Sequence, residues 1–156
     1  MTFQQNVGLK NKVAIQGDRA NQNPTIYQTV NYLAGSGGVE VGGFAWRSAS
    51  FPATQVVSSG SSVAQIAGFV ERVQNVNGFT YDPADMTIAE GENVTLARKG
   101  DFYVEADGAV SIGDTVYADY SDGSVTFTSG ATTVDSGYKA TTTASASGDM
   151  VIISNW

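Results

Sequence analysis

The chain has 156 residues, a length that suits one domain with a buried core. It contains no cysteine and no histidine, which excludes disulfides, thiolate metal sites and the commonest general base of enzymes. The net charge is −7 and uneven: residues 1–78 carry five basic and three acidic side chains, whereas residues 79–156 carry three basic and twelve acidic ones.

That acidic half would repel phosphate, so we expect no nucleic-acid partner. The sequence has no apolar run of the roughly 18 residues that a membrane helix needs, so we expect no membrane partner. Its first residues, "MTFQQNVGLKNK", lack the hydrophobic core of a cleaved signal. The low charged fraction of 15%, the 18 glycines and the many Ser, Thr and Val residues are typical of a turn-rich all-β protein.

Residues 1–25 are predicted to form an extended N-terminal arm. They hold many amides and few large apolar side chains, and "QGDRANQNP" at 16–24 has the period of neither a helix nor a strand. Val13 and Ile15 could form a short strand. Such an arm is either a frayed terminus or a segment that becomes ordered against a neighbouring chain. Residues 26–156 are predicted to form a single β domain.

The next stretch, "TIYQTVNYL", fits a short helix or a strand, and "AGSGG" after it reads as a turn. In "VEVGGFAW", the paired glycines Gly42 and Gly43 indicate a bulge or a close backbone approach, and Phe44 and Trp46 are expected to share a core face. Residues 54–74 predict two strands around a Ser/Gly turn. The second also has a helical spacing of apolar residues, but Gly68 within it favours a strand.

Residues 75–86 contain the turn signals "NG" and "DP" and are predicted to be a loop. From residue 87 the pattern changes to short alternating strands, predicted at Thr95–Ala97, Phe102–Ala106, Thr115–Asp119 and Ser124–Thr128. A closing hairpin is expected to join Tyr138–Ala144 to Met150–Ser154, with the last segment as a central strand. Together these elements predict a compact β-barrel or β-sandwich.

Six acidic residues cluster in "GDFYVEADGAVSIGDTVYADYSDGSVTF" at 100–127, where a metal site or an acid–base pair is conceivable. They are Asp101, Glu105, Asp107, Asp114, Asp119 and Asp122. Four of them adjoin a glycine at a predicted turn, where Asp bonds to the backbone ahead of it. The other two, Glu105 and Asp119, are predicted on the outer faces of strands. "DYSDGS" lacks the dense oxygen spacing of a calcium loop, and no catalytic motif is present, so we interpret the six as turn and surface residues.

Four stretches carry a resemblance to a known family. They are "QGDRANQNPT", "LAGSGGVEVGGFAW", "GFVERV" and "KGDFYVEADGAVSIGDTVYADYSDGSV". In this arrangement, which covers most of the chain, the protein resembles the structural cement (decoration) proteins of tailed-bacteriophage capsids.

The resemblance implies a structural virion protein, made in the host cytoplasm, that binds the outer surface of the major capsid protein shell and stabilises it. It implies a homo-oligomer, dimer or trimer, with no cofactor and no enzymatic activity. An amide-rich arm can pair with a partner by strand addition. The expected contacts with the capsid or a neighbouring subunit are Phe3, Val7, Leu9, Val13, Ile15, Asn23 and Pro24.

Two alternative functions remain open from the residues. The first is a carbohydrate-binding or adhesin-like β module of a virion fibre, which would use surface aromatic rings. Its candidate residues are Tyr81, Tyr103, Tyr117, Tyr120 and Trp156. The second is a carboxylate-dependent hydrolase, which predicts an Asp or Glu with a raised pKa inside a pocket.

Overall fold

The computed structural model describes residues 14–50, 55–61, 65–73, 81–82 and 86–156, and these residues form strands and turns but no helix. The first six strands are β1 (Ile26–Tyr27), β2 (Tyr32–Ala34), β3 (Val39–Glu40), β4 (Phe44–Arg47), β5 (Val56–Ser58) and β6 (Ile66–Val70). The next five are β7 (Tyr81–Asp82), β8 (Thr87–Ile88), β9 (Asn93–Val94), β10 (Leu96–Lys99) and β11 (Asp101–Glu105). The last four are β12 (Thr115–Asp119), β13 (Val125–Thr126), β14 (Thr133–Ala140) and β15 (Met150–Ser154). The predicted all-β fold class is confirmed.

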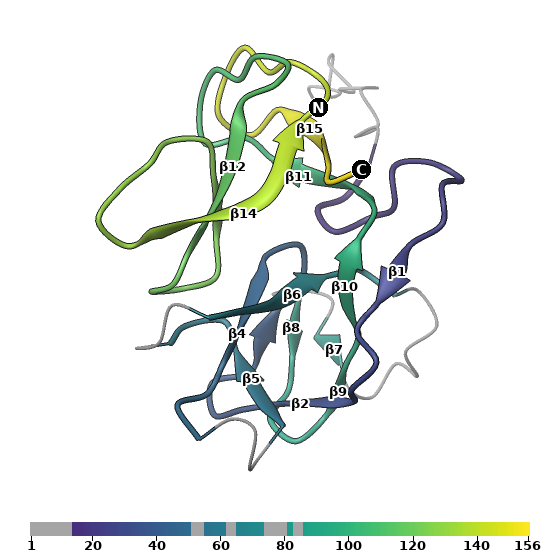
Figure 1. Ribbon diagram of the computed structural model, residues 1–156, viewed down its shortest axis with the longest axis vertical. Coiled ribbons are helices and arrows are strands. Elements are labelled where there is room, and N and C mark those ends of the chain that lie inside the picture. Colours follow the sequence, from purple (N-terminus) through teal and green to yellow (C-terminus); the bar gives the residue numbers. More distant parts are fainter. Residues whose placement is uncertain (1–13, 51–54, 62–64, 74–80, 83–85) are drawn as a thin grey trace, which may run out of the picture.

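A seven-stranded sheet in the order β1-β10-β6-β4-β5-β2-β9 forms one part of the molecule, the lower part in Figure 1. Its edge strand β9 leads into β10, the second strand from the other edge, through Thr95 alone. The two ends of the sheet therefore approach each other, and the sheet curls in the manner of a barrel. A small sheet in the order β3-β8-β7 lies beside it.

The second part, above the first in Figure 1, is a five-stranded antiparallel sheet in the order β11-β15-β14-β12-β13. Strand β15 pairs with β11 on one side and with β14 on the other, so the predicted central position of the last strand is confirmed. Along β11 the side chains of Phe102 and Val104 are buried, as the predicted alternation required.

Two apolar cores share the central strands of the seven-stranded sheet. Phe44 and Trp46 of β4 belong to the core between that sheet and the five-stranded one, and this confirms their predicted shared face. Ala45, between them in sequence, points into the second core, under the curl of the seven-stranded sheet. Strand β4 is therefore covered on both faces and links the two parts of the molecule.

Several predicted elements have different bounds in the structure. The stretch that fitted a helix or a strand contains the short strands β1 and β2, and residues 66–70 form the predicted strand β6. Residues 81–82, predicted as loop, form β7, because they pair with β8. The closing hairpin begins earlier than predicted, since β14 spans Thr133–Ala140, and β13 is shorter than predicted, with only Val125–Thr126. The local sequence pattern therefore predicted most of these segments correctly as strands, but it did not predict the residues at which the strands begin and end.

The predicted close backbone approach at Gly42 and Gly43 is confirmed. A Cβ atom on Gly43 would lie 2.6 Å from the carbonyl oxygen of Gly123, in the turn between β12 and β13. At Gly42, which has a φ of +82°, a Cβ would clash with the side chain of Gln16. Two stretches of backbone meet here with no room for side chains, and this contact adds to the apolar core that joins the two parts of the molecule.

Tyr138 is buried at the centre of the first core with its hydroxyl group unpaired among the described residues. Its ring lies 5.7 Å from Phe44, 6.2 Å from Phe69 and 6.4 Å from Phe102, measured between ring centres. Burial, with the negative charge of Asp101, raises the pKa of the phenol well above its ordinary value.

Replacement of Tyr138 with phenylalanine is expected to raise the free energy of unfolding by about 1 kcal/mol, because it keeps the ring and removes an unpaired buried hydroxyl. Urea denaturation of both proteins measures the difference. The matched control is Tyr117→Phe, at a half-buried position in β12, with an expected change within about 0.5 kcal/mol. A less stable Tyr138→Phe variant would show that the hydroxyl is bonded in the folded protein.

Candidate binding surface

Residues 14–25, the described part of the predicted arm, lie against β11 of their own chain. The amides of Gly17 and Ala20 donate to the carbonyls of Tyr103 and Asp101, both at 2.8 Å, and the Tyr103 amide donates to the carbonyl of Asp18 at 2.9 Å. These bonds cover the outer edge of β11, which would otherwise be the open edge of the five-stranded sheet. In this segment the backbone is therefore already paired within the chain.

Asp101 holds this segment in place through its side chain. It is only 5% exposed, and its Oδ2 accepts hydrogen bonds from the side-chain amides of Asn21 and Asn23, both at 2.7 Å. Burial alone would raise the pKa of this carboxyl group. Hydrogen bonds from Ser154, Asn21 and Asn23 outweigh that effect and hold the pKa below its usual value. The amide-rich composition of the segment thus serves a contact inside the molecule.

Residues 14–25 and β11 also contribute to a hollow of about 460 Å³, which we call the Glu71 hollow. It is lined by Ala14, Asp18, Arg19, Tyr27, Glu71, Arg72, Val73 and Tyr103. Arg19 donates from Nη2 to Oε1 of Glu71 at 3.1 Å and to the hydroxyl of Tyr27 at 2.6 Å. A second ion pair joins Arg72 to Asp18 at 2.9 Å. Two carboxylates and two guanidinium groups thus form the wall.

The two members of the first ion pair differ in their access to water. The side chain of Arg19 is 42% exposed, whereas that of Glu71 is 7% exposed. Oε2 of Glu71 is buried and has no hydrogen-bond partner among the described residues. Burial raises the pKa of the Tyr27 phenol, and the hydrogen bond and negative charge of Glu71 raise it further. The phenol of Tyr27 is therefore partly buried close to both Arg19 and Glu71.

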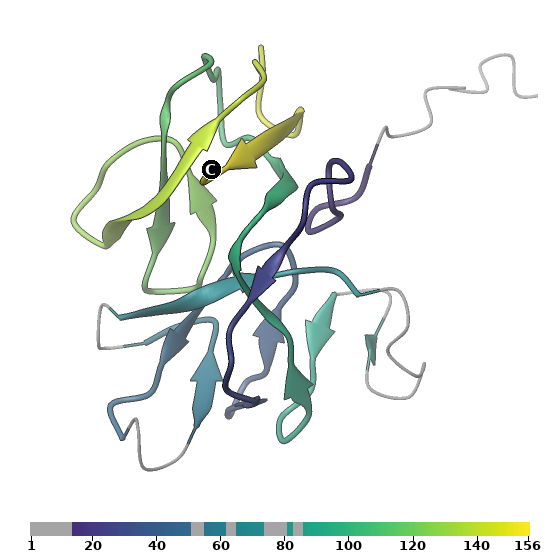
Figure 2. The same cartoon turned by 45° about the vertical axis from the view of Figure 1, so that its right-hand side comes forward.

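Two exposed isoleucines are sequence neighbours of residues that line the hollow. Ile15 follows Ala14 of the lining, and Ile26 precedes Tyr27 in β1; both isoleucines are exposed. Strand β1 is the outermost strand of the seven-stranded sheet, beside β10 in Figures 1 and 2. The next pair along this edge is Lys99 and Trp156: the Lys99 ammonium lies 5.3 Å from the centre of the exposed indole ring. An outer strand with exposed apolar groups is a common feature of protein-binding surfaces.

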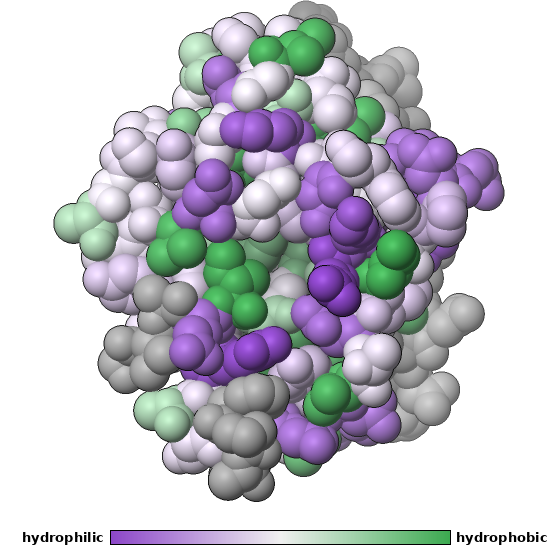
Figure 3. Space-filling model, viewed as in Figure 1, coloured by the Kyte–Doolittle hydropathy of each residue, from purple (hydrophilic) through white to green (hydrophobic). Residues whose placement is uncertain are grey.

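On the face shown in Figure 3, apolar groups occur as small separate patches among hydrophilic ones. Large continuous apolar areas are the usual mark of a hydrophobic docking face. On that face, recognition would have to depend on polar contacts with small apolar areas around them.

Two of the six clustered carboxylates, Asp114 and Asp122, have the turn role that the sequence predicted, and Asp119, predicted on a strand face, is the last residue of β12. Asp114 accepts from the amide of Ser111 at 2.8 Å, and Asp122 accepts from the amide of Ser124 at 2.9 Å. Asp119 accepts from the amide and hydroxyl of Ser121 and from the hydroxyl of Thr132. These hydrogen bonds from Ser121 hold the pKa of Asp119 below its usual value.

The turn interpretation is wrong for Asp101, whereas Asp107 lies at its predicted bend but accepts hydrogen bonds from outside that bend. Asp101 is the first residue of β11 and is buried, and its partners lie 78 and 80 positions earlier in the chain. Asp107 accepts from the hydroxyl of Thr126, at the end of β13, and from the amide of Phe127. Both carboxylates connect distant segments, which proximity to a glycine did not indicate.

No group of three or more metal-ligating side chains occurs among the residues that the structure describes. The lowered pKa values of Asp101 and Asp119 are the opposite of what the hydrolase hypothesis requires of those two groups. We also find in the described ranges no helix with the length and apolar character needed to cross a bilayer.

Comparison with known proteins identifies the family. A family model described as structural cement protein (E217 gp24/Pam3 gp6), a phage cement family, matches residues 3–155. The chain belongs to this family. A chain of the solved capsid of Myoviridae phage XM1 has the same fold as this cement protein, with a TM-score of 0.67 and 18% identity. The similarity covers 99% of this chain and 98% of that one. A search of curated proteins returned no match.

The cement protein is therefore a structural, capsid-stabilising component of a bacteriophage, as the sequence resemblance implied. The alternative of a carbohydrate-binding fibre module is not favoured. Of its candidate aromatic residues, Tyr120 packs edge-on against the buried Trp46, with 6.2 Å between ring centres. Tyr103 lines the Glu71 hollow, and Trp156 lies under Lys99. The side chain of Tyr81 lies outside the described part of the structure.

The expected contact residues of the cement protein are only partly covered by the structure. Phe3, Val7, Leu9 and Val13 lie outside the described residues. Ile15 is exposed beside the hollow, and Asn23 and Pro24 are exposed on the segment along β11. The side-chain amide of Asn23 is engaged by Asp101. That these seven residues contact the capsid or a neighbouring subunit stays a prediction.

Sequence reasoning did not find Glu71, Arg19 or Tyr27 as members of a site. Glu71 and Arg19 are 52 positions apart in the sequence, and neither lies in a catalytic or ligand-binding motif. The only local signal is a glutamate beside an apolar strand in "GFVERV". Charged residues are rarely fully buried unless they are paired, so only the structure could identify this one.

Proposed function

We propose that this cement protein binds the outer surface of the assembled major capsid protein shell as a homo-oligomer, dimer or trimer, and acts by binding rather than by catalysis. The observation that carries the proposal is the family match over residues 3–155. Production in the host cytoplasm, followed by addition to the shell, fits a protein whose function is to hold assembled subunits together.

The proposal is supported by the strand-based scaffold and by the exposed apolar residues in and near the edge strand β1. A protein that binds only the assembled shell stabilises that state by mass action, in proportion to the logarithm of its free concentration over the dissociation constant. Each copy needs only a modest interface, because many copies on a closed lattice act together.

Heating of particles with and without the protein tests the stabilising role. We expect particles without it to open at a lower temperature, and re-addition of the purified protein to restore the transition in a concentration-dependent way. A dye that fluoresces on exposed DNA reports the opening. Equal opening temperatures over a full titration would contradict the proposal.

Location and stoichiometry need separate measurements. Limited proteolysis of intact particles should cut this protein before the shell protein if it lies on the outer surface. Mass spectrometry of purified particles should give hundreds of copies for a lattice component, whereas a handful would indicate a tail or vertex position. Light scattering of the purified protein gives its oligomeric state, and a monomer at all concentrations would exclude a stable free dimer or trimer.

A further inference from the structure

We infer that Ile26, Lys99 and Trp156 form an anchor patch that binds a carboxylate-bearing segment of the capsid shell protein. This inference rests on the proposed function, because it names the face of the molecule that the shell would contact. Ile26 of β1 lies directly opposite Lys99 of β10, and the Lys99 ammonium lies 5.3 Å from the ring centre of Trp156. Side chains at directly opposite positions of an antiparallel pair project from the same face, so all three belong to one surface.

The anchor patch is accessible to another molecule. Trp156 is 57% exposed, Ile26 is 44% exposed, and Lys99 is half-buried. Strand β1 pairs only with β10, so no strand in the described part of the chain covers its other side. An aromatic ring beside an aliphatic side chain at the open edge of a sheet is a combination that protein interfaces use.

The exposed indole ring is held in position before any partner binds. The side-chain amide of Asn155, the residue before Trp156, donates to the carbonyl of Arg98 at 2.8 Å and accepts from the amide of Gly100 at 3.0 Å. These two hydrogen bonds join the chain beside Trp156 to the backbone on both sides of Lys99. A side chain on an ordered backbone loses less conformational entropy when it is covered, and tryptophan is among the residues that most often carry binding energy.

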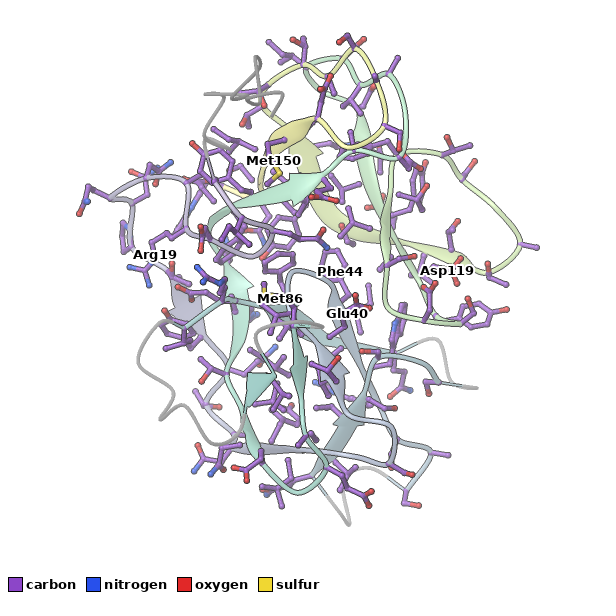
Figure 4. The ribbon with its side chains drawn as sticks, turned by 180° about the vertical axis from the view of Figure 1, so that it is seen from behind. Arg19, Glu40, Phe44, Met86, Asp119 and Met150 are labelled. Atoms are coloured by element: carbon purple, nitrogen blue, oxygen red, sulfur yellow. The ribbon has the colours of Figure 1, made fainter. Side chains whose placement is uncertain are left out.

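The charge of the anchor patch favours a carboxylate as the group that it binds. Arg98 and Lys99 are adjacent cations in a chain with a net charge of −7, yet neither forms an ion pair with another described residue. Arg19, which bonds to Tyr27 of β1, lies on the opposite side of the molecule from Asp119 in Figure 4. The acidic turn that begins at Asp119 is therefore remote from this edge and does not neutralise it.

The same charge disfavours a second copy of the protein as the occupant. A two-fold contact through the patch would bring two Lys99 ammonium groups into one interface, where like charges repel. A shell segment with a carboxylate between apolar side chains fits better. Its carboxylate would meet Lys99 in a charge-assisted hydrogen bond, and its apolar groups would cover Trp156 and Ile26.

The experiment uses capsid shells that lack this protein and measures its binding to them by co-sedimentation at several salt concentrations. For Lys99→Glu we expect binding at least about tenfold weaker at low salt, with a deficit that shrinks as salt screens the repulsion. For Trp156→Ala we expect a loss of at least about tenfold with little dependence on salt, because the lost contact is mainly apolar. Trp156→Phe keeps an aromatic ring and should recover part of that loss.

Two matched controls lie outside the anchor patch. Lys139→Glu makes the same charge change at an exposed lysine of β14, and Ile112→Ser changes an isoleucine that is 69% exposed in the turn between β11 and β12. Both should bind within about twofold of wild type, whereas Ile26→Ser should bind at least about threefold more weakly. Urea denaturation checks that each variant folds. If Lys99→Glu does not, Lys99→Gln replaces it, with an expected loss of at least about threefold.

Binding within about twofold of wild type for either Lys99→Glu or Trp156→Ala would overturn the inference. Equal weakening by Lys99→Glu and Lys139→Glu would overturn it too, because it would show a general effect of net charge. Light scattering of the free variants tests the other occupant: if they lose self-association in proportion to their loss of binding, the patch joins copies of the protein and the inference is wrong. If the wild-type protein itself fails to bind the shells, the proposed function fails, and that outcome is distinct from these.

Discussion

Replacement of Gly123 with alanine is expected to lower the free energy of unfolding by about 3 kcal/mol or more, because it combines backbone strain with a clash against fixed backbone. Gly123 has a φ of +81°, and a Cβ there would lie 2.6 Å from the carbonyl oxygen of Phe44 and 2.7 Å from that of Ser59. The carbonyl of Gly123 also accepts from the Phe44 amide at 2.8 Å. This contact joins the β12–β13 turn to β4, so the two parts of the molecule would separate slightly.

Thermal and urea denaturation measure the loss, with an expected fall in the melting temperature of about 6–12 °C for a chain of this size. The matched control is Gly113→Ala. Gly113 has a similar φ of +92°, but a Cβ there would meet nothing within 4 Å. It should therefore cost only the left-handed strain, about 1–2 kcal/mol. If both variants lose the same stability, the close approach of the two layers contributes nothing.

The second large effect is expected at Asp101. Asp101→Asn keeps the shape of the side chain but removes the charge that Asn21, Asn23 and Ser154 stabilise. Hydrogen bonds to a charged group are stronger than neutral ones, so we expect a loss of about 2 kcal/mol at pH 7. Residues 14–25 should also loosen from β11. Faster hydrogen exchange at the Ala20 amide, which donates to the Asp101 carbonyl, would report this loosening.

The effect of Asp101→Asn should depend on pH in a defined direction. The folded-state pKa of Asp101 is lowered from its usual value of 3.8, so its carboxylate stabilises the folded protein fully above that value. The contribution is lost as the pH falls through the folded-state pKa. The stability difference between wild type and variant should therefore be constant from pH 5 to 7 and shrink below about pH 4.

Asp119 also has a lowered pKa, but it is present in both proteins, so the difference between them isolates Asp101. The control is Asp114→Asn, at a half-buried turn position whose carboxylate accepts one hydrogen bond, from the amide of Ser111. We expect a loss there of less than about 1 kcal/mol. A difference between wild type and Asp101→Asn that is unchanged at pH 3 would show that the charge of Asp101 is not what anchors residues 14–25.

The sequence by itself determined those features of the fold that depend on residues close together along the chain. The alternation of Phe102 and Val104 in β11 and of Val116 and Ala118 in β12 placed those side chains in the core, because strand side chains alternate between two faces. The glycine pair at 42–43 predicted a close backbone approach, since only glycine leaves that space. The four quoted stretches identified the family, which the match over residues 3–155 confirms.

Only the tertiary structure decided which charged groups act together. Asp101 and Asp114 each follow a glycine, yet one is a buried anchor and the other a half-buried turn residue, because the register of β11 brings Asp101 to Asn21 and Asn23. Arg19 and Glu71 meet across 52 positions because residues 14–25 pair with β11 and the carbonyl of Gly17 accepts from the amide of Arg72, the residue after Glu71. Local patterns record the preferences of a few consecutive residues, whereas these contacts depend on sheet pairing between distant segments.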